Sequence, residues 1–385
     1  MVLNVNATRQ PLKILHVFRA PVGGLFRHVT DLVHGQSTKG HQVGIVADSL
    51  TGGENADRRL AELAPHLALG ATRIPMGRYL GLGDIAATRA VAAAIARMTP
   101  DVVHGHGAKG AAYARLAGVP RHAIRVYTPH GGSLHYRPGT LVGAIYIAIE
   151  KILKTRTDLF LFESEYIHAL FNRRVGATRA LVKVVRNGVA DSEFAEVALA
   201  PGATDLLYIG ELRSIKGVTI LIDAIAGLLP SGLTLTATIV GDGPDREALL
   251  ARAKARGVAD LVRFRNPMPA REAFALGNVM VVPSYGESLP YVVLEAGAAA
   301  KPLVATNVGG IPEIFGSQAA RLTEPGDCAA LMRALKDAVN DPETMRASAM
   351  ALQERIRSVF SVKTMVEDGL SAYAEALRRK AGAQV

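Results

Sequence analysis

Two glutamates eight residues apart, Glu287 and Glu295, lie in the part of the chain with the clearest chemical content. An apolar stretch, 279–282, predicts a strand that ends at Pro283, and a short polar loop then carries Glu287. Pro290 suits the first position of a helix that contains Glu295. Ligands of open α/β sheets bind at the carboxyl ends of the strands, and the N–H groups of a helix start suit a phosphate. Because apolar residues flank both carboxylates, we expect them beside a phosphate site rather than in bulk solvent.

Two cations follow another predicted strand. Arg213 and Lys216 come shortly after the apolar stretch 205–210. A guanidinium binds a phosphate through two hydrogen bonds, and a lysine ammonium acts on it as a point charge. Taken alone, the pair is most simply interpreted as solvated loop charges. Opposite a helix start near Pro290, it predicts a clamp for a diphosphate.

Histidines and glycines follow other predicted strands. His130 lies between a strand and Gly131-Gly132, where its imidazole can donate or accept a hydrogen bond. His104 and His106 are expected in a neighbouring loop as supporting or acceptor-side residues, and their spacing by itself does not predict a metal site. Gly23-Gly24 follows the first strand and permits close approach of the backbone to a ligand.

One acidic residue raises the alternative of a dinucleotide cofactor. Asp48 ends the second predicted strand, where a dinucleotide-binding fold places the acid that binds the ribose. The glycine turn before it, at 20–28, does not match the G-x-G-x-x-G fingerprint. The dinucleotide interpretation is therefore not favoured.

The elements that must position these residues follow a regular alternation. Strand-like apolar stretches alternate with amphipathic helical ones, as expected for a parallel sheet covered on both faces. The alternation occurs twice, which predicts two doubly wound, Rossmann-like α/β domains facing each other across a cleft. The first spans residues 1–190 and the second 191–360, with a linker at 187–204; a terminal helix at about 361–385 packs back onto the first. The predicted strands are 12–18, 42–47, 102–104, 125–128, 159–163 and 183–185, then 205–210, 235–240, 261–264, 279–282 and 302–305.

The composition limits the classes of protein to which this chain can belong. The chain has 385 residues, of which 49% are hydrophobic and 20% charged, which suits two buried cores and is unlike a disordered chain. A single cysteine, Cys328, cannot form an internal disulfide, so a reducing, cytoplasmic setting is expected. Residues 1–10 lack the apolar stretch of a signal peptide, and no apolar run reaches the roughly 20 residues that span a bilayer. Any membrane contact is expected to be peripheral, on the inner face.

Charge is divided unevenly along the chain. Residues 1–190 hold 24 Lys and Arg against 11 Asp and Glu, whereas residues 191–385 hold 20 against 23. A basic half suits an anionic lipid surface, a phosphorylated acceptor or nucleic acid, or it only keeps the protein soluble. Nucleic acid is not expected, because the chain has no Trp and no recognisable binding module. The stretch 151–156 either lies against anionic headgroups or is the charged end of a buried helix.

In their order and spacing, these motifs resemble those of glycosyltransferase family 4, of the GT-B fold, and the resemblance covers nearly the whole chain. Two positions depart from the family's pattern. Glu211 stands where the family usually has Arg, so Arg213 must supply that cation, and Ser288-Leu289-Pro290 replaces a common Gly-Phe-Gly. The matching motifs are Gly23-Gly24, Thr128-Pro129-His130-Gly131, Arg186-Asn187-Gly188-Val189, the loop 210–217, Gly241-Asp242-Gly243-Pro244, Pro283-Ser284 and an E-x7-E pair ending in Leu294-Glu295-Ala296.

The resemblance implies a retaining hexosyltransferase that binds a nucleotide-diphosphate sugar mainly in its second domain and an acceptor mainly in its first. It implies that Glu287 contacts the donor sugar, that Glu295 binds the ribose, and that His130 contacts the sugar at its reacting face. Arg213 and Lys216 neutralise the diphosphate leaving group. No divalent metal or other cofactor is implied, because cationic side chains and a helix dipole take its place. The further donor-binding candidates are Gly23, Gly24, Asn187, Met268 in a base pocket, Ser288, Leu289, Pro290 and Tyr291.

Three functions remain open from the sequence. The leading one is a transferase that builds a cell-surface or exported polysaccharide on a lipid-linked or oligosaccharide acceptor, by front-face displacement rather than through a covalent Glu287 intermediate. The second is another GT-B enzyme, such as a sugar-nucleotide epimerase or a soluble glucan or disaccharide synthase. The third is a nucleotide-cofactor binding protein without enzymatic activity. The sugar, base, acceptor and linkage are not fixed by the sequence.

Overall fold

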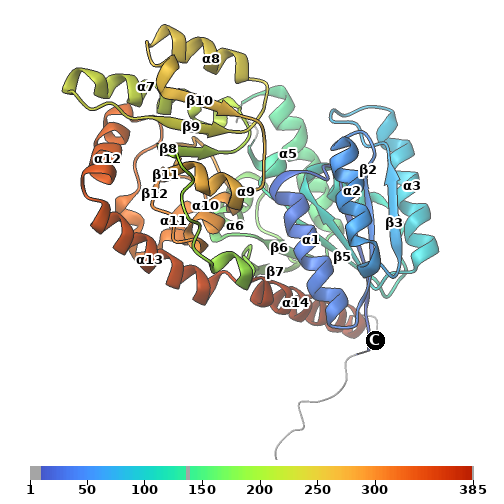
Figure 1. Cartoon of the computed structure of the whole chain (residues 1–385). Helices are drawn as coiled ribbons and strands as arrows, with labels where there is room; N and C mark the ends of the chain where they lie inside the picture. The colour runs from blue at the N-terminus through green and yellow to red at the C-terminus, as the bar shows by residue number, and fades with distance from the viewer. Residues whose placement is uncertain (1–9, 136–138, 384–385) are drawn as a thin grey trace, which may run out of the picture. The chain divides into compact units, whose positions relative to one another are not determined.

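The computed structural model describes residues 10–135 and 139–383 (Figure 1). By contacts within the chain it divides into two units. The N-terminal unit runs to Glu163 and includes Ile167–Val185 and the chain from Met365 on; the C-terminal unit is Ser164–Tyr166 with Arg186–Thr364. The sequence predicted changes of domain at residue 190 and at about residue 361, and the units change at 185–186 and 364–365.

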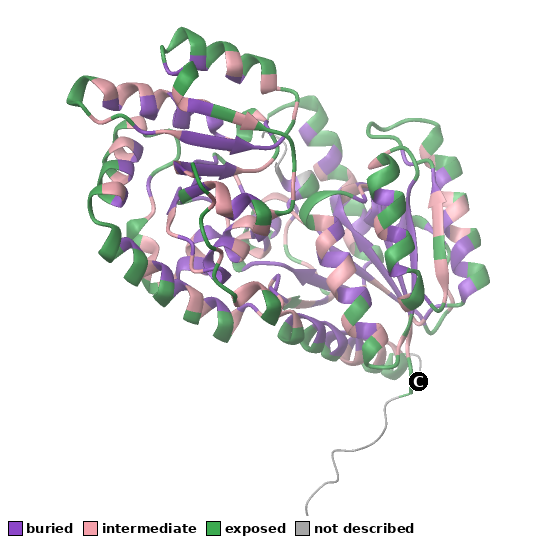
Figure 2. Cartoon of the chain, in the orientation of Figure 1, coloured by how far each residue is buried: buried purple, intermediate pink, exposed green. Residues whose placement is uncertain are grey.

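The N-terminal unit is built on a parallel sheet of seven strands in the order β3-β2-β1-β4-β5-β6-β7. Five of the six residues of β1 are buried, as in a parallel strand covered on both faces (Figure 2). Alternate side chains of β1 enter different cores: Val17 packs with the helices α3 and α4, and Phe18 with α1 and α2. The strands are β1 (Lys13–Phe18), β2 (Gln42–Asp48), β3 (Gly70–Ile74), β4 (Val102–His106), β5 (Ile124–Thr128), β6 (Leu159–Phe162) and β7 (Leu181–Val184).

Helices cover both faces of this sheet, and the last helix returns to it from the end of the chain. The helix α14 lies beside α1, where Lys39 forms an ion pair with Glu367 at 3.0 Å (Figure 1). At Gly35 of α1 an added Cβ would lie 2.4 Å from the side chain of Val366, so the small residue allows this close packing. The helices are α1 (Gly23–Thr38), α2 (Gly53–Leu63), α3 (Gly83–Met98), α4 (Gly107–Leu116), α5 (Leu141–Leu153), α6 (Glu165–Arg174) and α14 (Val362–Gly382).

The C-terminal unit is built on a parallel sheet of five strands in the order β10-β9-β8-β11-β12. The helix α7 is apolar on most sides and buries seven residues, each of which contributes roughly 1.5–3 kcal/mol of transfer free energy if it is a large aliphatic side chain. The strands are β8 (Thr204–Ile209), β9 (Ala237–Val240), β10 (Val262–Arg265), β11 (Gly277–Val282) and β12 (Leu303–Ala305). The helices are α7 (Val218–Leu228), α8 (Arg246–Ala255), α9 (Ala270–Ala273), α10 (Tyr291–Ala298), α11 (Ile311–Phe315), α12 (Cys328–Asn340) and α13 (Pro342–Val359).

The structure confirms all eleven predicted strands, with ends that differ by at most two residues, and adds one. The additional strand, β3, lies at the edge of its sheet, and only Ile74 of its five residues is buried, so it has no apolar run to mark it. The predicted linker at 187–204 was wrong. Asn187 and Val189 are buried, and the backbone of Val189 pairs with Ser361, so this stretch packs within the C-terminal unit.

Candidate functional site

The sheet of the C-terminal unit places one pair of loops where ligands of such sheets bind. The chain runs from β8 outward to β9 and β10 on one side, and returns to β11 and β12 on the other. The order therefore reverses between β8 and β11, and the crevice at the carboxyl ends of two such strands is the usual ligand site of an open α/β sheet. The loops 210–217 and 283–290 follow these two strands.

Within these loops the structure joins Lys216 to Glu287. The Lys216 ammonium donates to both carboxylate oxygens of Glu287, each at 2.8 Å, and the Ser284 hydroxyl donates to Oε1 at 2.7 Å. Glu287 is only 7% exposed, whereas the side chain of Lys216 is 28% exposed. The carboxylate is thus fixed from inside the fold, and the ammonium reaches solvent.

Two loops hold the Glu287 segment by close backbone contacts. The Tyr285 N–H donates to the Ile215 carbonyl at 2.8 Å, and Gly310 N–H donates to the Ser288 carbonyl at 2.6 Å. Gly217 has a φ of +70°, and a Cβ there would lie 1.9 Å from the Pro283 carbonyl oxygen. Glycine is needed at such a position both for the positive φ and for the contact. The loops after β8 and β12 therefore fix the loop after β11 from both sides.

Arg213 does not join Lys216 at a shared group in this structure. Its guanidinium pairs with Glu211 at 2.9 Å, and the side chain is 38% exposed. Glu211 is the residue at the position where an arginine was expected, so the chain carries a carboxylate and a cation there as a pair. Burial, with the charges of Glu287 and Glu211, raises the pKa of the Tyr208 hydroxyl, which donates to the Glu211 carbonyl at 3.0 Å.

The remaining donor-site candidates of this unit line the start of α10. Pro290 precedes the helix as its N-cap residue, so the prediction that it opens the helix was off by one position. Glu295 lies inside α10 and is partly exposed. Ser288 is partly exposed, and Leu289 and Tyr291 are buried.

Two further candidates of the C-terminal unit hold this segment in place. The Asn187 side chain is 3% exposed and donates to the Leu289 carbonyl at 2.9 Å, so it supports the α10 loop from beneath. Met268 is partly buried against the apolar cluster that contains Leu289. Asn187 therefore holds the segment from inside the fold, whereas Met268 is partly exposed beside it.

In the N-terminal unit the structure corrects the expected places of two histidines. His104 and His106 were expected in a loop, although His104 was also the last residue of the predicted strand 102–104; both lie in β4 and are fully buried. Their register explains this, since His104 pairs with His16 and His106 with Phe18 on the neighbouring strand β1. Neighbouring residues of a sheet share a face, so these histidines point toward the side that α1 covers.

A row of hydrogen-bonded imidazoles extends from this face to the candidate His130. The His16 Nε2 lies 2.9 Å from Oε1 of Gln36, and its Nδ1 lies 2.9 Å from Nε2 of His106. The row continues from His106 Nδ1 to His130 Nε2 at 3.1 Å. An amide oxygen only accepts, so each imidazole in turn donates through Nε2 and accepts through Nδ1. His130, at the open end of the row, has a left-handed φ of +50°.

Burial keeps these imidazoles neutral. Desolvation lowers the pKa of His16 to about 4. Desolvation also holds the pKa of His106 and His130 well below the ordinary value, and the charge that neighbouring histidines would carry adds to the effect. The N-terminal unit thus offers uncharged donors and acceptors at its sheet edge.

The other N-terminal candidates are a glycine turn and an acid. Gly23 and Gly24 open α1, and Gly23 has a φ of +62° with no atom near an added Cβ, so its backbone is accessible. Asp48 is fully buried and accepts from the backbone of Leu50 at 3.0 Å and of Met76 at 2.7 Å. Its carboxylate is thus engaged in holding its own loop, which disfavours a ribose-binding role.

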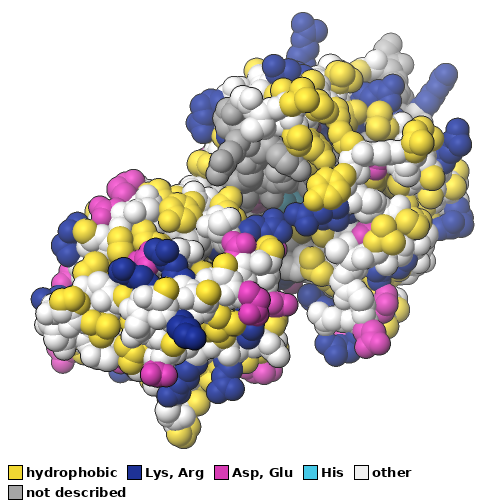
Figure 3. All heavy atoms as spheres, turned by 90° about the horizontal axis from the view of Figure 1, so that it is seen from above, with side chains coloured by type: hydrophobic (Ala, Val, Ile, Leu, Met, Phe, Trp, Pro, Cys, Tyr) yellow, Lys and Arg dark blue, Asp and Glu magenta, His cyan; other side chains and the backbone are white. Residues whose placement is uncertain are grey.

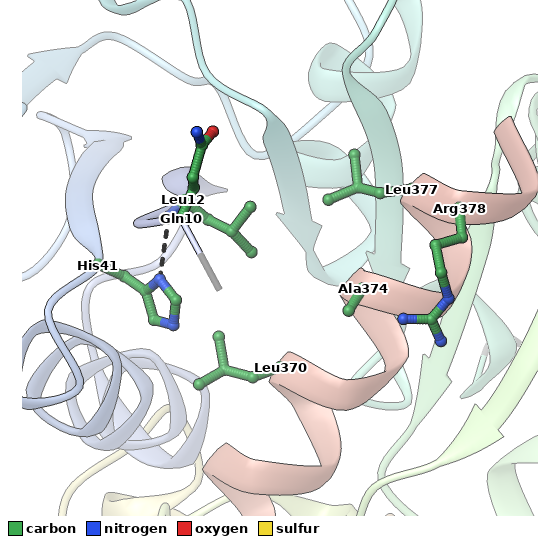
Figure 4. Close-up of a pocket in the computed structure, with 7 residues that line it drawn as sticks. All are labelled: Gln10, Leu12, His41, Leu370, Ala374, Leu377 and Arg378. Carbon is green, nitrogen blue, oxygen red and sulfur yellow. Dashed lines mark hydrogen bonds between the residues drawn. The ribbon is translucent and has the colours of Figure 1, made fainter. Parts of the chain in front are cut away.

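A cavity of about 270 Å³ lies elsewhere in the N-terminal unit (Figure 4). Leu12 and His41 on its wall precede β1 and β2, at the amino ends of these strands, and α14 closes it from the other side. Ligands of such sheets bind at the opposite ends of the strands. The cavity is therefore not part of the candidate site. Its lining consists of Gln10, Leu12, His41, Leu370, Ala374, Leu377 and Arg378.

Sequence reasoning gave no role to several residues that build both places. In the C-terminal unit these are Ser284, which binds Glu287, and Thr306, which donates to the Ser284 carbonyl at 2.7 Å. In the N-terminal unit they are His16, His28 and Gln36. A polar residue inside an otherwise apolar strand, such as His16, is a signal that could have been used, but its partners lie 20 and 90 residues away.

Comparisons with known proteins agree with the position of these motifs. A family model described as "Glycosyltransferase Family 4" matches residues 22–193, and one described as "Glycosyl transferases group 1" matches residues 203–341. A glycogen synthase of Mycobacterium tuberculosis is 28% identical over 93% of this chain and 92% of its own length. The 2-deoxystreptamine glucosyltransferase of Streptomyces kanamyceticus is 26% identical over 88% and 96%.

Solved structures share the fold at lower identity. A sucrose-phosphate synthase from Thermosynechococcus elongatus matches with a TM-score of 0.78 and 20% identity, over 96% of this chain and 100% of the other. The Anabaena protein HepE, solved in complex with UDP and glucose, matches with a TM-score of 0.77 and 19% identity, over 94% and 99%. Both of these structures are similar to this chain over both of its units.

Proposed function

Since the chain belongs to glycosyltransferase family 4 and is an enzyme of the GT-B fold, we propose that it transfers a hexose, with retention, from a nucleotide-diphosphate sugar to a hydroxyl of a lipid-linked glycan. The observation that carries the donor half of this proposal is the Lys216–Glu287 pair at the reversal point of the C-terminal sheet. A solvent-reaching ammonium beside a fixed carboxylate suits a ligand that is anionic at one end and rich in hydroxyls at the other.

In the proposed reaction, the bond between the anomeric carbon and the diphosphate oxygen breaks while the acceptor oxygen bonds to the same face of that carbon. The acceptor's proton passes to the leaving diphosphate. Lys216 and Arg213 stabilise the negative charge that develops there. Glu287 accepts hydrogen bonds from the donor sugar, Glu295 binds the ribose, and His130 contacts the sugar at its reacting face. A covalent role for Glu287 is not favoured, since such a nucleophile must attack from the opposite face.

The acceptor half rests on the helix α5. On this helix, the side chain of Leu141 is 78% exposed and that of Ile152 is 67% exposed. Val142 and Ile145 are 52% and 41% exposed. Lys151 is also exposed. The alternative of an ordinary buried helix thus fails for most of its apolar side chains. An amphipathic helix of this kind suits the interface of an anionic membrane, which would bring a lipid-linked acceptor to the enzyme.

On the face drawn in Figure 3, the basic side chains do not form one continuous field, because Lys and Arg are interspersed with apolar and acidic side chains. No helix among residues 10–135 and 139–383 is long and apolar enough to cross a bilayer. We propose that the membrane contact is peripheral and centred on the exposed apolar side chains of α5.

The donor is tested by thermal stability in the presence of UDP-, GDP- and ADP-sugars. A ligand at about 100 times its Kd stabilises a protein by roughly 2.7 kcal/mol, so one nucleotide class should raise Tm by about 5 °C. Lys216→Met should remove this shift, and Lys254→Met, an exposed lysine on α8, should retain it. A panel without any shift in the wild type would contradict the donor proposal.

The acceptor surface is tested by sedimentation with vesicles. The doubly substituted Ile145→Asp, Ile152→Asp protein should bind vesicles of phosphatidylcholine and phosphatidylglycerol several-fold less than wild type, without loss of Tm. The matched control is Met350→Asp on α13, which exchanges another exposed apolar side chain, 58% exposed, for a charge. Equal binding by all three proteins would overturn the role of α5.

A second candidate is a soluble glucan synthase, which the likeness to a glycogen synthase over most of both chains favours. It would extend a free glucan rather than a lipid-linked one. Transfer assays with glycogen and with a lipid-linked glycan separate the two. Conversion of the sugar nucleotide without any acceptor would instead indicate an epimerase.

A further inference from the structure

We propose that His28, His106 and His130 form a binding site for one divalent transition-metal ion of the Zn²⁺ type in the N-terminal unit. Each of the three residues offers a ring nitrogen, and these nitrogens all lie within 4.8 Å of one another. They come from three elements, α1, β4 and the turn after β5. The transfer reaction itself is expected to need no metal, and His130 is common to this site and to the proposed contact with the donor sugar.

The spacing of two of these nitrogens already approaches that of metal ligands. His106 Nδ1 and His130 Nε2 are 3.1 Å apart, with one proton between them. Zinc binds imidazole nitrogens at about 2.0–2.1 Å in a tetrahedral arrangement, which separates any two of them by about 3.3 Å. An ion can therefore take the place of the shared proton with a small displacement. The proton that His130 carried on Nε2 moves to its Nδ1, so Nε2 can bind the ion and no proton is released to solvent.

The third imidazole lies against the other two. The ring of His28 is 4.8 Å from that of His130 and 5.6 Å from that of His106, measured between centroids, and it meets both edge-on. An edge-on approach directs the rim of the His28 ring, where its nitrogens and hydrogens lie, at its neighbours. Rotation of one side chain on α1 completes a set of three nitrogen ligands.

The opposite nitrogen of His106 has a hydrogen-bond acceptor, the imidazole of His16, in the place where a metal-bound histidine usually has a carboxylate, a carbonyl or water. It donates from Nε2 to His16 Nδ1 at 2.9 Å, and His16 in turn donates to Gln36. A ligating imidazole almost always donates its second N–H to such an acceptor, which fixes its tautomer and orientation. In this tautomer the lone pair of His106 is on Nδ1, toward His28 and His130.

A second set, His16, His104 and His106, is also close enough in space but is already engaged. His104 bonds to the Tyr373 hydroxyl at 2.7 Å through Nδ1 and to the Thr128 hydroxyl at 2.8 Å through Nε2. Either nitrogen of His104 would have to give up its hydrogen-bond partner before it could bind a metal ion. The His28 set leaves both of these bonds of His104 in place, with His16 as an outer partner.

Ligand chemistry selects the kind of ion. Three imidazoles without a carboxylate suit Zn²⁺, Co²⁺, Ni²⁺ or Cu²⁺, and not Mg²⁺ or Ca²⁺, which take oxygen ligands. Burial keeps the pKa of His106 and His130 well below the ordinary value, so both offer a lone pair at neutral pH. Three protein ligands leave a fourth position for water or a small ligand.

The test is a titration of the full, untagged chain with Co²⁺. We expect one Co²⁺ per chain, with the strong visible absorption of a four-coordinate cobalt ion, and its displacement by Zn²⁺ but not by Mg²⁺. Isothermal titration with Zn²⁺ alone should give the same stoichiometry. Absence of a saturable visible spectrum, or the weak spectrum of six-coordinate cobalt, would overturn the proposal.

Four variants locate the ion. His28→Asn and His106→Asn should lose more affinity than the roughly 10–100-fold that removal of an outer-shell partner costs, and His16→Asn should fall within that range. His122→Asn is the control, because this histidine is 61% exposed and lies outside the cluster. His28 is on a helix and remains informative if the β4 variant folds poorly. Unchanged affinity in His28→Asn, or a change in His122→Asn equal to it, would contradict the assignment.

Discussion

The two units place different chemistry at the same edge of the same kind of sheet. In the C-terminal unit, loops after β8 and β11 bring together an ammonium and a carboxylate, Lys216 and Glu287, and the ammonium reaches solvent. In the N-terminal unit, the strands themselves carry the polar groups, His16 and His106, which are neutral and fully buried. The difference follows from where each side chain is attached.

A loop residue can keep its charge because water or a ligand solvates one side of it. A strand residue in a sheet covered on both faces cannot, because the cost of burying an unpaired charge amounts to several kcal/mol. The N-terminal unit therefore replaces charge by hydrogen bonds between neutral rings. On this view, charge recognition of the donor belongs to the C-terminal unit, and the N-terminal unit contributes uncharged contacts.

The largest expected effect is on catalysis by Glu287. Glu287→Gln keeps the volume and one acceptor but removes the charge that faces Lys216, and we expect transfer to fall by roughly 10²–10³-fold, as when one preorganised partner of a transition state is lost. Steady-state kinetics with the identified donor measure this, and circular dichroism checks the fold. Glu247→Gln, at an 87% exposed side chain on α8, should transfer as wild type. Full activity of Glu287→Gln would show that transfer does not need the charge of Glu287, which contradicts a charged donor site in the C-terminal unit.

The next effect concerns the loop contacts that hold the charged site. Gly217→Ala meets the Pro283 carbonyl at 1.9 Å and also has an unfavourable φ of +70°, so we expect a loss of about 2–4 kcal/mol of unfolding free energy and weaker donor binding. Gly257→Ala is a matched control in the same unit, with a φ of +70° and no atom within 4 Å. Gly257→Ala should lower the free energy of unfolding by only about 1 kcal/mol. Equal losses in urea denaturation would show that the close contact does not matter.

Acid should act on the neutral cluster. The pKa of His16 is lowered from 6.5 to about 4 in the folded protein, so between these values the unfolded chain binds a proton that the folded chain does not. Neutral His16 therefore contributes about 3 kcal/mol to the free energy of unfolding above about pH 6.5. This contribution is lost as the pH falls toward 4. Urea denaturation from pH 7.5 to 4.5 measures it. His16→Asn should show a shallower decline than wild type, and His122→Asn the same decline; parallel curves for all three would contradict a neutral cluster.

The smallest effect is that of salt on the charged site. Lys216 is partly exposed, so its attraction for a diphosphate is screened. Affinity for the nucleotide diphosphate should fall roughly two- to fivefold between about 0.05 M and about 0.5 M salt. Isothermal titration measures the slope, which Lys216→Met should flatten and Lys254→Met should leave unchanged. A steep slope in Lys216→Met would assign the anion contact to another cation.

Much of the fold was predictable because its signal is local. The strand β11 and the proline after it are visible as a run of apolar residues with a stop, and the same holds for the other strands predicted from the sequence. The edge strand β3 was not predictable, because a half-exposed strand buries too few residues to show a period. His104 and His106 were misplaced for a related reason, since polar residues usually mark a loop, and their burial depends on the facing α1.

For the candidate site, the sequence supplied the residue types, and the fold supplied the partners. The presence of Glu287, Lys216 and His130 near strand ends follows from periodicity and from the glycines and prolines beside them. That Lys216 binds Glu287, 71 positions further along the chain, and that His106 stands between His16 and His130, depends on the order of strands in each sheet. Strand order is set by packing of the whole unit, which no local pattern encodes. The sequence therefore determined which groups are available, and only the tertiary structure decided which of them meet.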